Sequence, residues 1–385
     1  MHQATVGTTR LLARPGDRRL WLLDANAAAL WDLHQAGWAP APLAGLLAER
    51  FELAPNAARA YVDGLQAHWQ AAGLLTDAEN PGWRHAPAEA IPPLPAPPAA
   101  APPPGAWRLS LADRAVSLSI QDTALRARLA PLLAPRPGGD RTGHPAPRPD
   151  QLVLHGDGAH WRLSANGRVL QSGQGPEAAL VALLSTLTEL GCRPAERLLV
   201  IHGAGLVAPD GRALLLVAPG GSGKSTLTAA LNAQGFGLLS DDVVPVTLAG
   251  ELLGLGLPLC LKAGSWPVLA AVLPDLAQAP TLERFGQRVR FLPSAGPPAS
   301  GPQRPACCLL PRYDPDHPAV VQRLAPEETL QGIITAEAVL RDLTQAKLAV
   351  LARWVSDLPA YAIRYPTLNH GLALVHDLLR RDSPQ

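Results

Sequence analysis

Side chains suited to ligand binding and catalysis are concentrated in residues 213–246, ALLLVAPGGSGKSTLTAALNAQGFGLLSDDVVPV. A glycine-rich segment there ends in Gly-Lys-Ser, and glycines let backbone N–H groups converge on phosphate oxygens that side chains would otherwise block. Lys224 would then reach the β- and γ-phosphates of a nucleotide, and the Ser225 hydroxyl would ligate Mg²⁺. The predicted nucleotide-binding residues are Ala218, Pro219, Gly220, Gly221, Ser222, Gly223, Lys224, Ser225 and Thr226.

One position departs from the G-x-x-x-x-G-K-[ST] pattern, because Ala218 stands where the pattern has its first glycine. Alanine is small enough to make that turn. An alternative is a glycine-rich turn that binds nothing. A buried strand predicted at 213–217 and a helix predicted at 226–234, whose dipole points at the same anion, favour the nucleotide site. Gly235 is a natural stop for that helix.

An acid pair follows at the carboxyl end of a second predicted strand, 236–240, where α/β sheets hold their ligands. In such a site one acid holds Mg²⁺, and a second can accept the proton of an attacking hydroxyl. Asp241 and Asp242 therefore favour a phosphotransferase over a simple nucleotide holder. The alternative for one of the two is that it opens a turn before Val243.

This order of strand, loop, short helix ending in glycine and short strand ending in Asp-Asp resembles HPr kinase/phosphorylase and the wider group of HPr-kinase-like serine kinases. The resemblance implies an α/β P-loop kinase core of the HPr-kinase/PEP-carboxykinase-like type, with ATP and Mg²⁺ as cofactors. It also implies a catalytic role for His202, because these kinases carry a histidine there that pairs with the catalytic aspartate. A histidine at a strand end is otherwise more often structural.

By the same resemblance, Asp242 is the preferred general base toward an acceptor serine, and Lys224 completes the catalytic set. Asp241 and Ser225 are then the metal ligands, although the roles of the two aspartates could be exchanged. Catalysis of this kind is mostly positioning and charge neutralisation, so a lysine, a metal ion and a carboxylate suffice.

The resemblance weakens downstream, where LGLPLCLKAGSWPVL (255–269) replaces the Glu- and Arg-rich signature that serves phosphorolysis in the bifunctional family. We therefore do not expect the reverse, phosphate-dependent reaction. Lys262, Arg288 and Arg290 are candidates for contacts to phosphate or acceptor, since Lys262 is one of only three lysines and the two arginines alternate along a predicted strand. A solvated strand edge and a solvated strand face are the alternatives.

Residues 1–80 predict a small winged-helix (α+β) domain, with a hairpin at 4–23 and helices at 24–35, 42–51 and 55–72. Its hydrophobic spacing resembles the PqqD-like peptide-recognition domain of ribosomal-peptide biosynthesis. The resemblance implies that a peptide adds as a strand at the hairpin edge, against the third helix. The predicted peptide-binding residues are Leu20, Trp21, Leu22, Leu23, Tyr61 and Leu65.

Two alternatives apply to this domain. Its aromatic residues Trp21, Trp31, Trp38, Tyr61 and Trp69 could simply fill the core. A DNA-reading winged helix is disfavoured, because the third helix has one arginine, no lysine and one aspartate.

The domain division follows from composition, because residues 81–106 are rich in proline and alanine and predict a semi-rigid linker. The rest, 107–385, is the predicted kinase domain, with leading strands at 107–197 and the nucleotide and catalytic core at 198–385. The formal net charge is only +1 over 385 residues, so the sequence lacks the excess of positive charge that favours binding to nucleic acid or to an anionic membrane. No apolar run suits a signal peptide or a bilayer span, so we expect a cytoplasmic protein without a membrane partner.

These patterns predict an ATP-dependent kinase that transfers the γ-phosphoryl group to a serine, or less favourably a threonine, of a ribosomally made precursor (leader) peptide. One alternative is an ATPase that delivers the peptide to other peptide-modifying enzymes. Another is a module that binds nucleotide without turnover. HPr kinases assemble as oligomers, and the resemblance leaves a homo-oligomer open for this chain.

Overall fold

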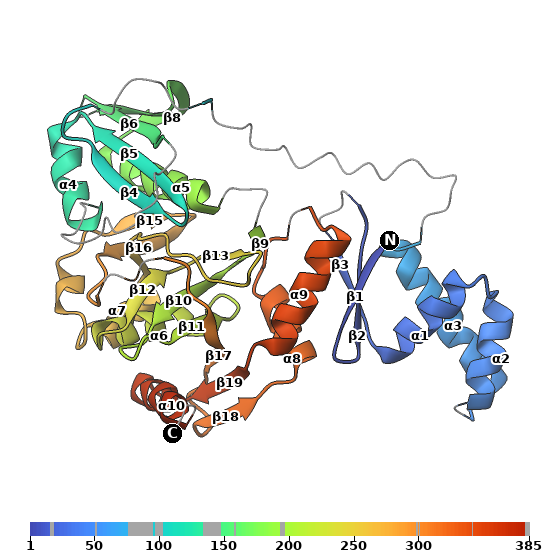
Figure 1. Ribbon diagram of the computed structural model, residues 1–385. Coiled ribbons are helices and arrows are strands. Elements are labelled where there is room, and N and C mark those ends of the chain that lie inside the picture. The colour runs from blue at the N-terminus through green and yellow to red at the C-terminus, as the bar shows by residue number, and fades with distance from the viewer. Residues whose placement is uncertain are drawn as a thin grey trace. The chain divides into compact units, whose positions relative to one another are not determined.

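A computed structural model of the chain describes residues 1–15, 19–50, 52–75, 95–96, 103–133, 148–157, 159–192, 197–297, 299, 301–340 and 342–381. These residues have a mixed α/β fold with several sheets and helices (Figure 1). The chain divides into two compact units, residues 1–93 with 342–353 and residues 94–341 with 354–385. Almost all of the linker predicted at 81–106 lies outside the described residues.

The first unit has an antiparallel sheet in the order β1-β2-β3, followed by helices. The predicted hairpin corresponds to β2 and β3, and β1 adds a third strand ahead of it. Asp24 caps the first helix, because its carboxylate accepts a hydrogen bond from the N–H of Ala27 at 2.8 Å. The elements are β1 (His2–Val6), β2 (Thr9–Ala13), β3 (Leu20–Leu23), α1 (Ala25–Gln35), α2 (Pro40–Arg50) and α3 (Pro55–Ala71).

The aromatic residues of the first unit divide between core and surface. Trp31 and Trp69 are buried, and their rings meet edge to face with centroids 5.3 Å apart. Trp38 and Tyr61 keep 43% and 47% of their surface exposed. Trp31 and Trp69 therefore fill the core, whereas Tyr61 on α3 (Pro55–Ala71) is open to solvent.

The second unit begins with a five-stranded sheet in the order β4-β5-β6-β7-β8. Only the β5–β6 pair is parallel, and helix α4 lies between these two strands in sequence, as a parallel pair requires a crossover. The leading strands predicted at 107–197 form this sheet. Its elements are β4 (Trp107–Leu111), β5 (Arg114–Ile120), α4 (Thr123–Leu133), β6 (Asp150–Gly156), β7 (His160–Ala165), β8 (Arg168–Gln174) and α5 (Pro176–Cys192).

The site-bearing sheet has six strands in the order β12-β10-β11-β17-β19-β18. Strands β11, β17 and β19 run parallel, whereas β10 runs antiparallel to both β11 and β12. The carboxyl ends of β11, β12, β17 and β19 therefore share one edge with the amino end of β10. The strands are β10 (Gly203–Val207), β11 (Ala213–Val217), β12 (Gly237–Ser240), β17 (Pro305–Tyr313), β18 (Val320–Arg323) and β19 (Ala360–Tyr365).

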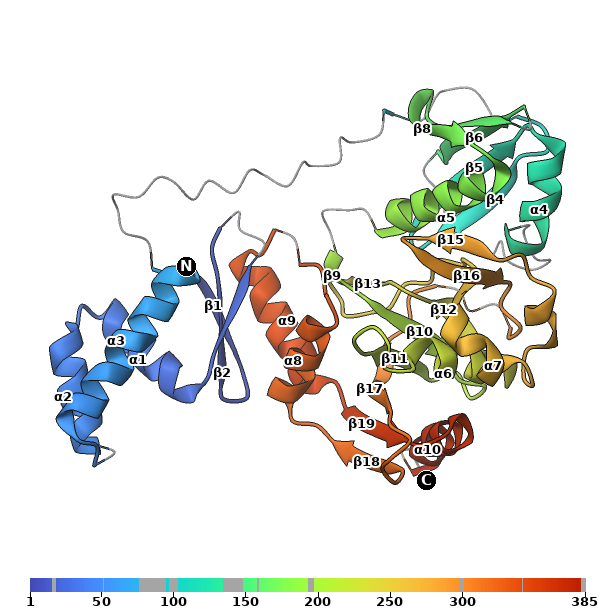
Figure 2. The same cartoon turned by 180° about the vertical axis from the view of Figure 1, so that it is seen from behind.

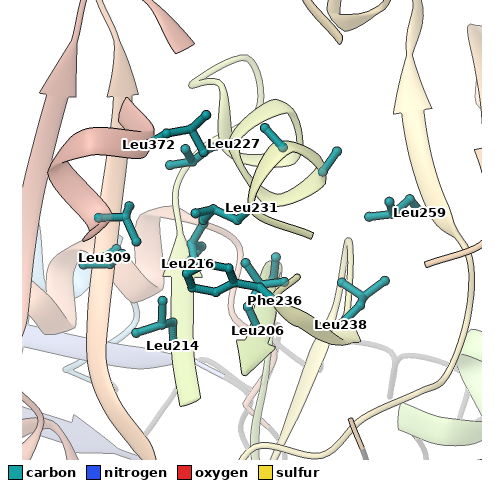
Figure 3. Packing of buried hydrophobic residues seen from close by; sticks show 14 of the residues in the cluster. Leu206, Leu214, Leu216, Leu227, Leu231, Phe236, Leu238, Leu259, Leu309 and Leu372 are labelled. Atoms are coloured by element: carbon teal, nitrogen blue, oxygen red, sulfur yellow. The ribbon is translucent and has the colours of Figure 1, made fainter. Parts of the chain in front are cut away.

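Helices α6 (Lys224–Ala233) and α10 (Leu368–Arg381) pack against each other on one face of this sheet. Leucines of the strands and helices meet there around Phe236 in a continuous apolar core (Figure 3). The strand predicted at 213–217 is confirmed, and the helix predicted at 226–234 begins two residues earlier, at Lys224. The six-stranded sheet and α6 therefore fix the positions of the glycine-rich loop and the acid pair.

Two smaller sheets complete the unit, β13-β9 and β14-β16-β15. None of the helices in the described part of the chain combines the length and apolar content needed to cross a membrane. The remaining elements, most of which Figure 2 labels in a view from behind, are β9 (Arg197–Ile201), β13 (Val244–Thr247), β14 (Leu259–Lys262), α7 (Trp266–Leu269), β15 (Leu282–Arg284), β16 (Gln287–Leu292), α8 (Pro326–Thr335) and α9 (Gln345–Asp357). Two short 3₁₀ turns, Ala263–Ser265 and Pro274–Ala277, flank α7.

One ion pair ties β9 to the turn between β4 and β5. The buried Arg197 donates from Nη1 to Asp113 Oδ2 at 2.9 Å, and its Nη2 contacts the other oxygen. Burial alone would raise the pKa of Asp113, but the hydrogen bond and charge of Arg197 lower it below 3.8. Since the carboxylate is favoured in the folded state, this stabilisation is present above the ordinary pKa and is lost as pH falls through the folded pKa.

We expect Asp113→Asn to reduce the free energy of unfolding by about 1–2 kcal/mol at pH 7, less than a fully buried pair would lose because Asp113 is half exposed. Urea unfolding followed by circular dichroism measures this difference. Asp63→Asn, which breaks the exposed Arg59–Asp63 pair on α3, is the matched control and should cost about 0.5 kcal/mol or less. Equal effects of the two variants would contradict a structural role for the Arg197 pair.

Candidate active site

The glycine-rich loop, residues 218–223, connects β11 to α6 at the shared edge of the six-stranded sheet. Gly221 and Gly223 have φ of 83° and 91°, in the left-handed region that L side chains avoid. A Cβ on Gly223 would also lie 2.8 Å from the Tyr365 hydroxyl and 3.1 Å from Tyr313 Cβ. The backbone therefore requires glycine at position 223, immediately before α6 begins.

Two tyrosines from neighbouring strands hold this loop. The N–H of Tyr313 donates to the carbonyl of Ser222 at 2.8 Å, and the hydroxyl of Tyr365 lies 3.5 Å from the carbonyl of Gly223. The Ser222 hydroxyl is buried and has no hydrogen-bond partner among the described residues. Helix α6 carries no acidic residue in its first turn, so its N-terminal partial charge is free to act on an anion.

Lys224 is the first residue of α6, and only 6% of it is exposed. A buried ammonium is costly unless an opposite charge lies near it. That charge is Asp241, whose carboxyl interacts electrostatically with Lys224. The structure thus places the predicted loop lysine and the first of the predicted acids together at the end of β11 and β12.

The Asp241 carboxyl is incompletely bonded, and its Oδ1 is buried. Its Oδ2 accepts a hydrogen bond from the N–H of Cys260 at 3.1 Å, whereas Oδ1 has no partner among the residues described. Burial raises the pKa of Asp241 above its ordinary value, against the opposing pull of the Lys224 ammonium. An unsatisfied carboxylate oxygen beside the glycine-rich loop is an arrangement that a cation would stabilise.

Asp242 is held by two cationic or proton-donating side chains. His202 Nε2 lies 3.3 Å from Oδ1, and Arg284 Nη1 donates to Oδ2 at 2.9 Å. Burial alone would raise the pKa of Asp242, but the His202 hydrogen bond and the Arg284 charge hold it well below its usual range. Asp242 therefore remains ionised at neutral pH, whereas the pKa of Asp241 is shifted in the opposite direction.

Strand pairing explains why His202 faces Asp242. His202 joins β9 to β10, and Asp242 lies between β12 and β13; β9 pairs with β13, and β10 pairs with β12. The N–H of Gly203 also donates to the carbonyl of Asp242 at 3.1 Å. Asp242 has a φ of 80°, a left-handed conformation that aspartate and asparagine tolerate better than most residues. On its other side, His202 Nδ1 lies 3.7 Å from the exposed Glu337.

Arg284 is the functional candidate that the sequence patterns did not single out. It ends β15, and a tight turn through Phe285 and Gly286, both with positive φ, leads into β16. Its Nη1 also lies 3.5 Å from Cys260 Sγ, and burial raises the pKa of that thiol to about 11, so the thiol stays neutral. The glycine at position 286 is a general turn signal that could have revealed the turn.

Arg288 and Arg290 lie on the opposite face of the β14-β16-β15 sheet from Arg284. The register pairs Arg284 with Gln287, which places the arginines of β16 on the other side of the pleat. Their guanidinium groups lie 5.5 Å and 4.1 Å from the Trp266 ring, and Arg290 donates to the Leu276 carbonyl at 2.7 Å. The structure thus does not bring these two predicted contact residues to Asp242.

Lys262 has a different position from the two arginines. It shares a face of β14 with Cys260, the residue whose N–H binds Asp241. The register pairs Lys262 with Val289, which in turn pairs with Leu282 at the start of β15. Arg284 is the last residue of that short strand. Lys262 is exposed, so it stays a candidate for contact with a phosphate or an acceptor.

Replacing Arg284 with glutamine should raise the pKa of Asp242, because the charge and the hydrogen bond of Arg284 that favour its carboxylate are lost. A pH titration followed by NMR of the side-chain carboxyl measures the shift. Arg288→Gln, on the opposite face of the same small sheet, is the matched control and should leave the pKa of Asp242 unchanged. If both variants shift it equally, Arg284 has no special role at Asp242.

The predicted peptide-binding residues lie on two elements of the first unit. Leu20–Leu23 form β3, one of the two edge strands of its sheet, and Tyr61 and Leu65 lie on α3. Leu23 is buried in the core, so its side chain is not available to a peptide. Trp21 is half buried, its Nε1 donates to the Ala72 carbonyl at 3.2 Å, and Arg19 lies 5.2 Å from its ring.

The described residues at the shared edge offer few ligands for a metal ion. The described residues contain no group of three or more histidine, cysteine, aspartate or glutamate side chains that could hold one. A Mg²⁺ ion that takes most of its ligands from a bound polyphosphate and water needs only one or two from the protein. The unpartnered Oδ1 of Asp241 fits such a ligand, and Ser225 follows Lys224 on α6.

Among the described residues, the edge therefore brings together a glycine-rich loop before a helix, a buried lysine, an acid with a buried and unpartnered oxygen, and an ionised acid flanked by histidine and arginine. Neither the models of known protein families nor the curated protein sequences give a match to this chain. The function is therefore inferred from the chemistry of these side chains.

Proposed function

We propose that the chain is an ATP-dependent kinase of the HPr-kinase-like group, which transfers the γ-phosphoryl group to a serine, or less favourably a threonine, of a precursor peptide. One observation carries the proposal: Asp241 and Asp242, adjacent in sequence, have opposite electrostatic surroundings beside the loop and Lys224. Different surroundings suit two carboxylates with different roles, one toward a metal ion and one toward an acceptor.

The surroundings of the two aspartates also support one assignment of their roles, with Asp241 as the metal ligand and Asp242 as the base. Asp241 interacts electrostatically with Lys224 and has a buried Oδ1 without a hydrogen-bond partner among the described residues, which suits a metal ligand. Asp242 is ionised and partly open to solvent, which suits a base that must reach an acceptor. Bound Mg²⁺, held by Asp241 and Ser225, would neutralise charge on the β- and γ-phosphates.

In the proposed reaction the acceptor hydroxyl gives its proton to Asp242 while its oxygen bonds to the γ-phosphorus. The bond from that phosphorus to the bridging oxygen breaks, and ADP leaves with the electron pair. His202 and Arg284 hold the Asp242 carboxylate, and Lys224 compensates charge on the transferred group. A strongly acidic carboxylate is a weak base, but orientation and charge neutralisation supply most of the rate in phosphoryl transfer.

At the level of fold, we assign the six-stranded sheet with its loop and α6 to the P-loop kinase core of the HPr-kinase/PEP-carboxykinase-like type. We assign the first unit's sheet and helices to a PqqD-like winged helix. The proposed peptide adds as a strand along β3, with Tyr61 of α3 offering an exposed ring. ATP and newly made peptides meet in the cytoplasm, so the proposed reaction takes place there.

The proposal is tested by incubating the protein with Mg-ATP and the short precursor-like peptide encoded nearest its gene. The intact mass of the peptide should rise by about 80 Da, and chelation of Mg²⁺ should prevent the gain. An unchanged peptide with accumulating free phosphate would instead favour the peptide-delivering ATPase. An unchanged peptide without phosphate release would favour a nucleotide-binding module.

A further inference from the structure

Tyr313 ends β17 at the same sheet edge as the glycine-rich loop, but on the other side of the loop from the acid pair. In the strand order, β11 lies between β10 and β17, and β12, which leads to Asp241 and Asp242, lies beyond β10. Adjacent strands are about 4.8 Å apart. The acid pair and Tyr313 therefore lie on opposite sides of the loop, and the distance between them is comparable to the length of a nucleotide.

The direction of a bound nucleotide follows from this order. Its phosphates would lie over the loop and the amino end of α6, and the γ-phosphate would point toward Lys224 and Asp241. The nucleoside must then leave the loop on the opposite side, toward the carboxyl ends of β17 and β19. The exposed ring at that place is Tyr313, with 51% of its surface open.

The surroundings of Tyr313 hold its ring in place. Its N–H donates to Ser222 of the loop, which fixes the backbone relative to the phosphate site. Its ring centroid lies 6.3 Å from that of Tyr365 at an interplanar angle of 54°, so the buried Tyr365 supports it from one side. A ring supported in this way can stack on a base with little loss of conformational entropy.

We propose that the base of the nucleotide stacks on the ring of Tyr313, an inference that rests on the proposed function. Stacking uses the π-face that every base has, so Tyr313 supplies affinity without selecting one purine over another. The Tyr313 backbone also contacts the loop directly, which couples the base subsite to the phosphate subsite.

The test compares the affinity of the full chain for ATP and for inorganic tripolyphosphate, which lacks a base, by titration calorimetry. Tyr313→Ala should weaken ATP binding about tenfold or more, and it should leave tripolyphosphate binding within about twofold. The backbone N–H that holds Ser222 is kept in this variant. Tyr313→Phe should restore ATP affinity to within about threefold, because the ring is kept.

Trp38→Ala removes an exposed aromatic ring from the first unit and is the control, with no expected effect on either ligand. Unchanged ATP affinity in Tyr313→Ala would overturn the stacking proposal and leave the proposed kinase function intact. Equal losses for ATP and tripolyphosphate would overturn it as well, because Tyr313 would then act on the loop alone. A wild-type chain that binds neither ligand would contradict the proposed function itself.

Discussion

Asp242→Asn is expected to slow phosphoryl transfer to peptide roughly 10²–10⁴-fold, the usual contribution of a positioned general base, while ATP affinity stays within about threefold. Asparagine keeps the shape of the side chain and an oxygen that accepts from Arg284. It also tolerates the left-handed backbone at this position, where φ is 80°. The variant therefore removes proton acceptance with little structural change, and single-turnover kinetics measures the loss.

Asp210→Asn is the matched control for this prediction. Asp210 lies in the turn between β10 and β11, where it pairs with Arg212 at the surface. Its loss should leave the rate of transfer unchanged. A transfer rate in Asp242→Asn close to the wild-type rate would show that Asp242 is not the base and would direct attention to Asp241.

Lys224→Met is expected to lower kcat/KM for ATP roughly 10²–10³-fold, the cost of removing a donor aimed at charge that develops in the transition state. Methionine preserves most of the buried stem, so the packing of α6 is retained. It removes the charge that the β- and γ-phosphates would meet. Steady-state kinetics at varied ATP concentration measures the effect, and thermal unfolding of the same sample checks that the fold is kept.

Lys347→Met is the corresponding control, since Lys347 lies on α9 and belongs to no part of the proposed site. It should leave kcat/KM for ATP unchanged. A normal kcat/KM in Lys224→Met would contradict the assignment of residues 218–226 to nucleotide binding. A loss in both variants would instead indicate a general loss of stability.

Local patterns predicted the part of the site that is continuous in sequence. The apolar run at 213–217, the glycines and the following helix each specify their own conformation, so the loop and α6 appear where they were predicted. The neighbourhood of His202 and Asp242 required more than local pattern. It depends on the pairing of β9 with β13 and of β10 with β12, and the prediction came from resemblance to a family.

Arg284 and Tyr313 show why the rest could not be predicted. Arg284 reaches Asp242 only because a turn at Phe285–Gly286 folds β15 back on β16, and that turn also sends Arg288 and Arg290 to the other face. The prediction that Arg288 and Arg290 share one face of a strand is confirmed. The spacing of the two arginines does not indicate which face of the strand is turned toward Asp242. Tyr313 lies beside the loop through a parallel pairing between strands far apart in the chain, which no local pattern specifies.

Phosphoryl transfer from ATP to the peptide is tested by following the γ-phosphate of labelled ATP in a single reaction with the precursor-like peptide. The label is measured in the peptide and in free phosphate. The proposal predicts that most of the label appears on a serine of the peptide, in amounts that rise with peptide concentration. Label found only in free phosphate, at a rate that does not depend on the peptide, would contradict a peptide kinase.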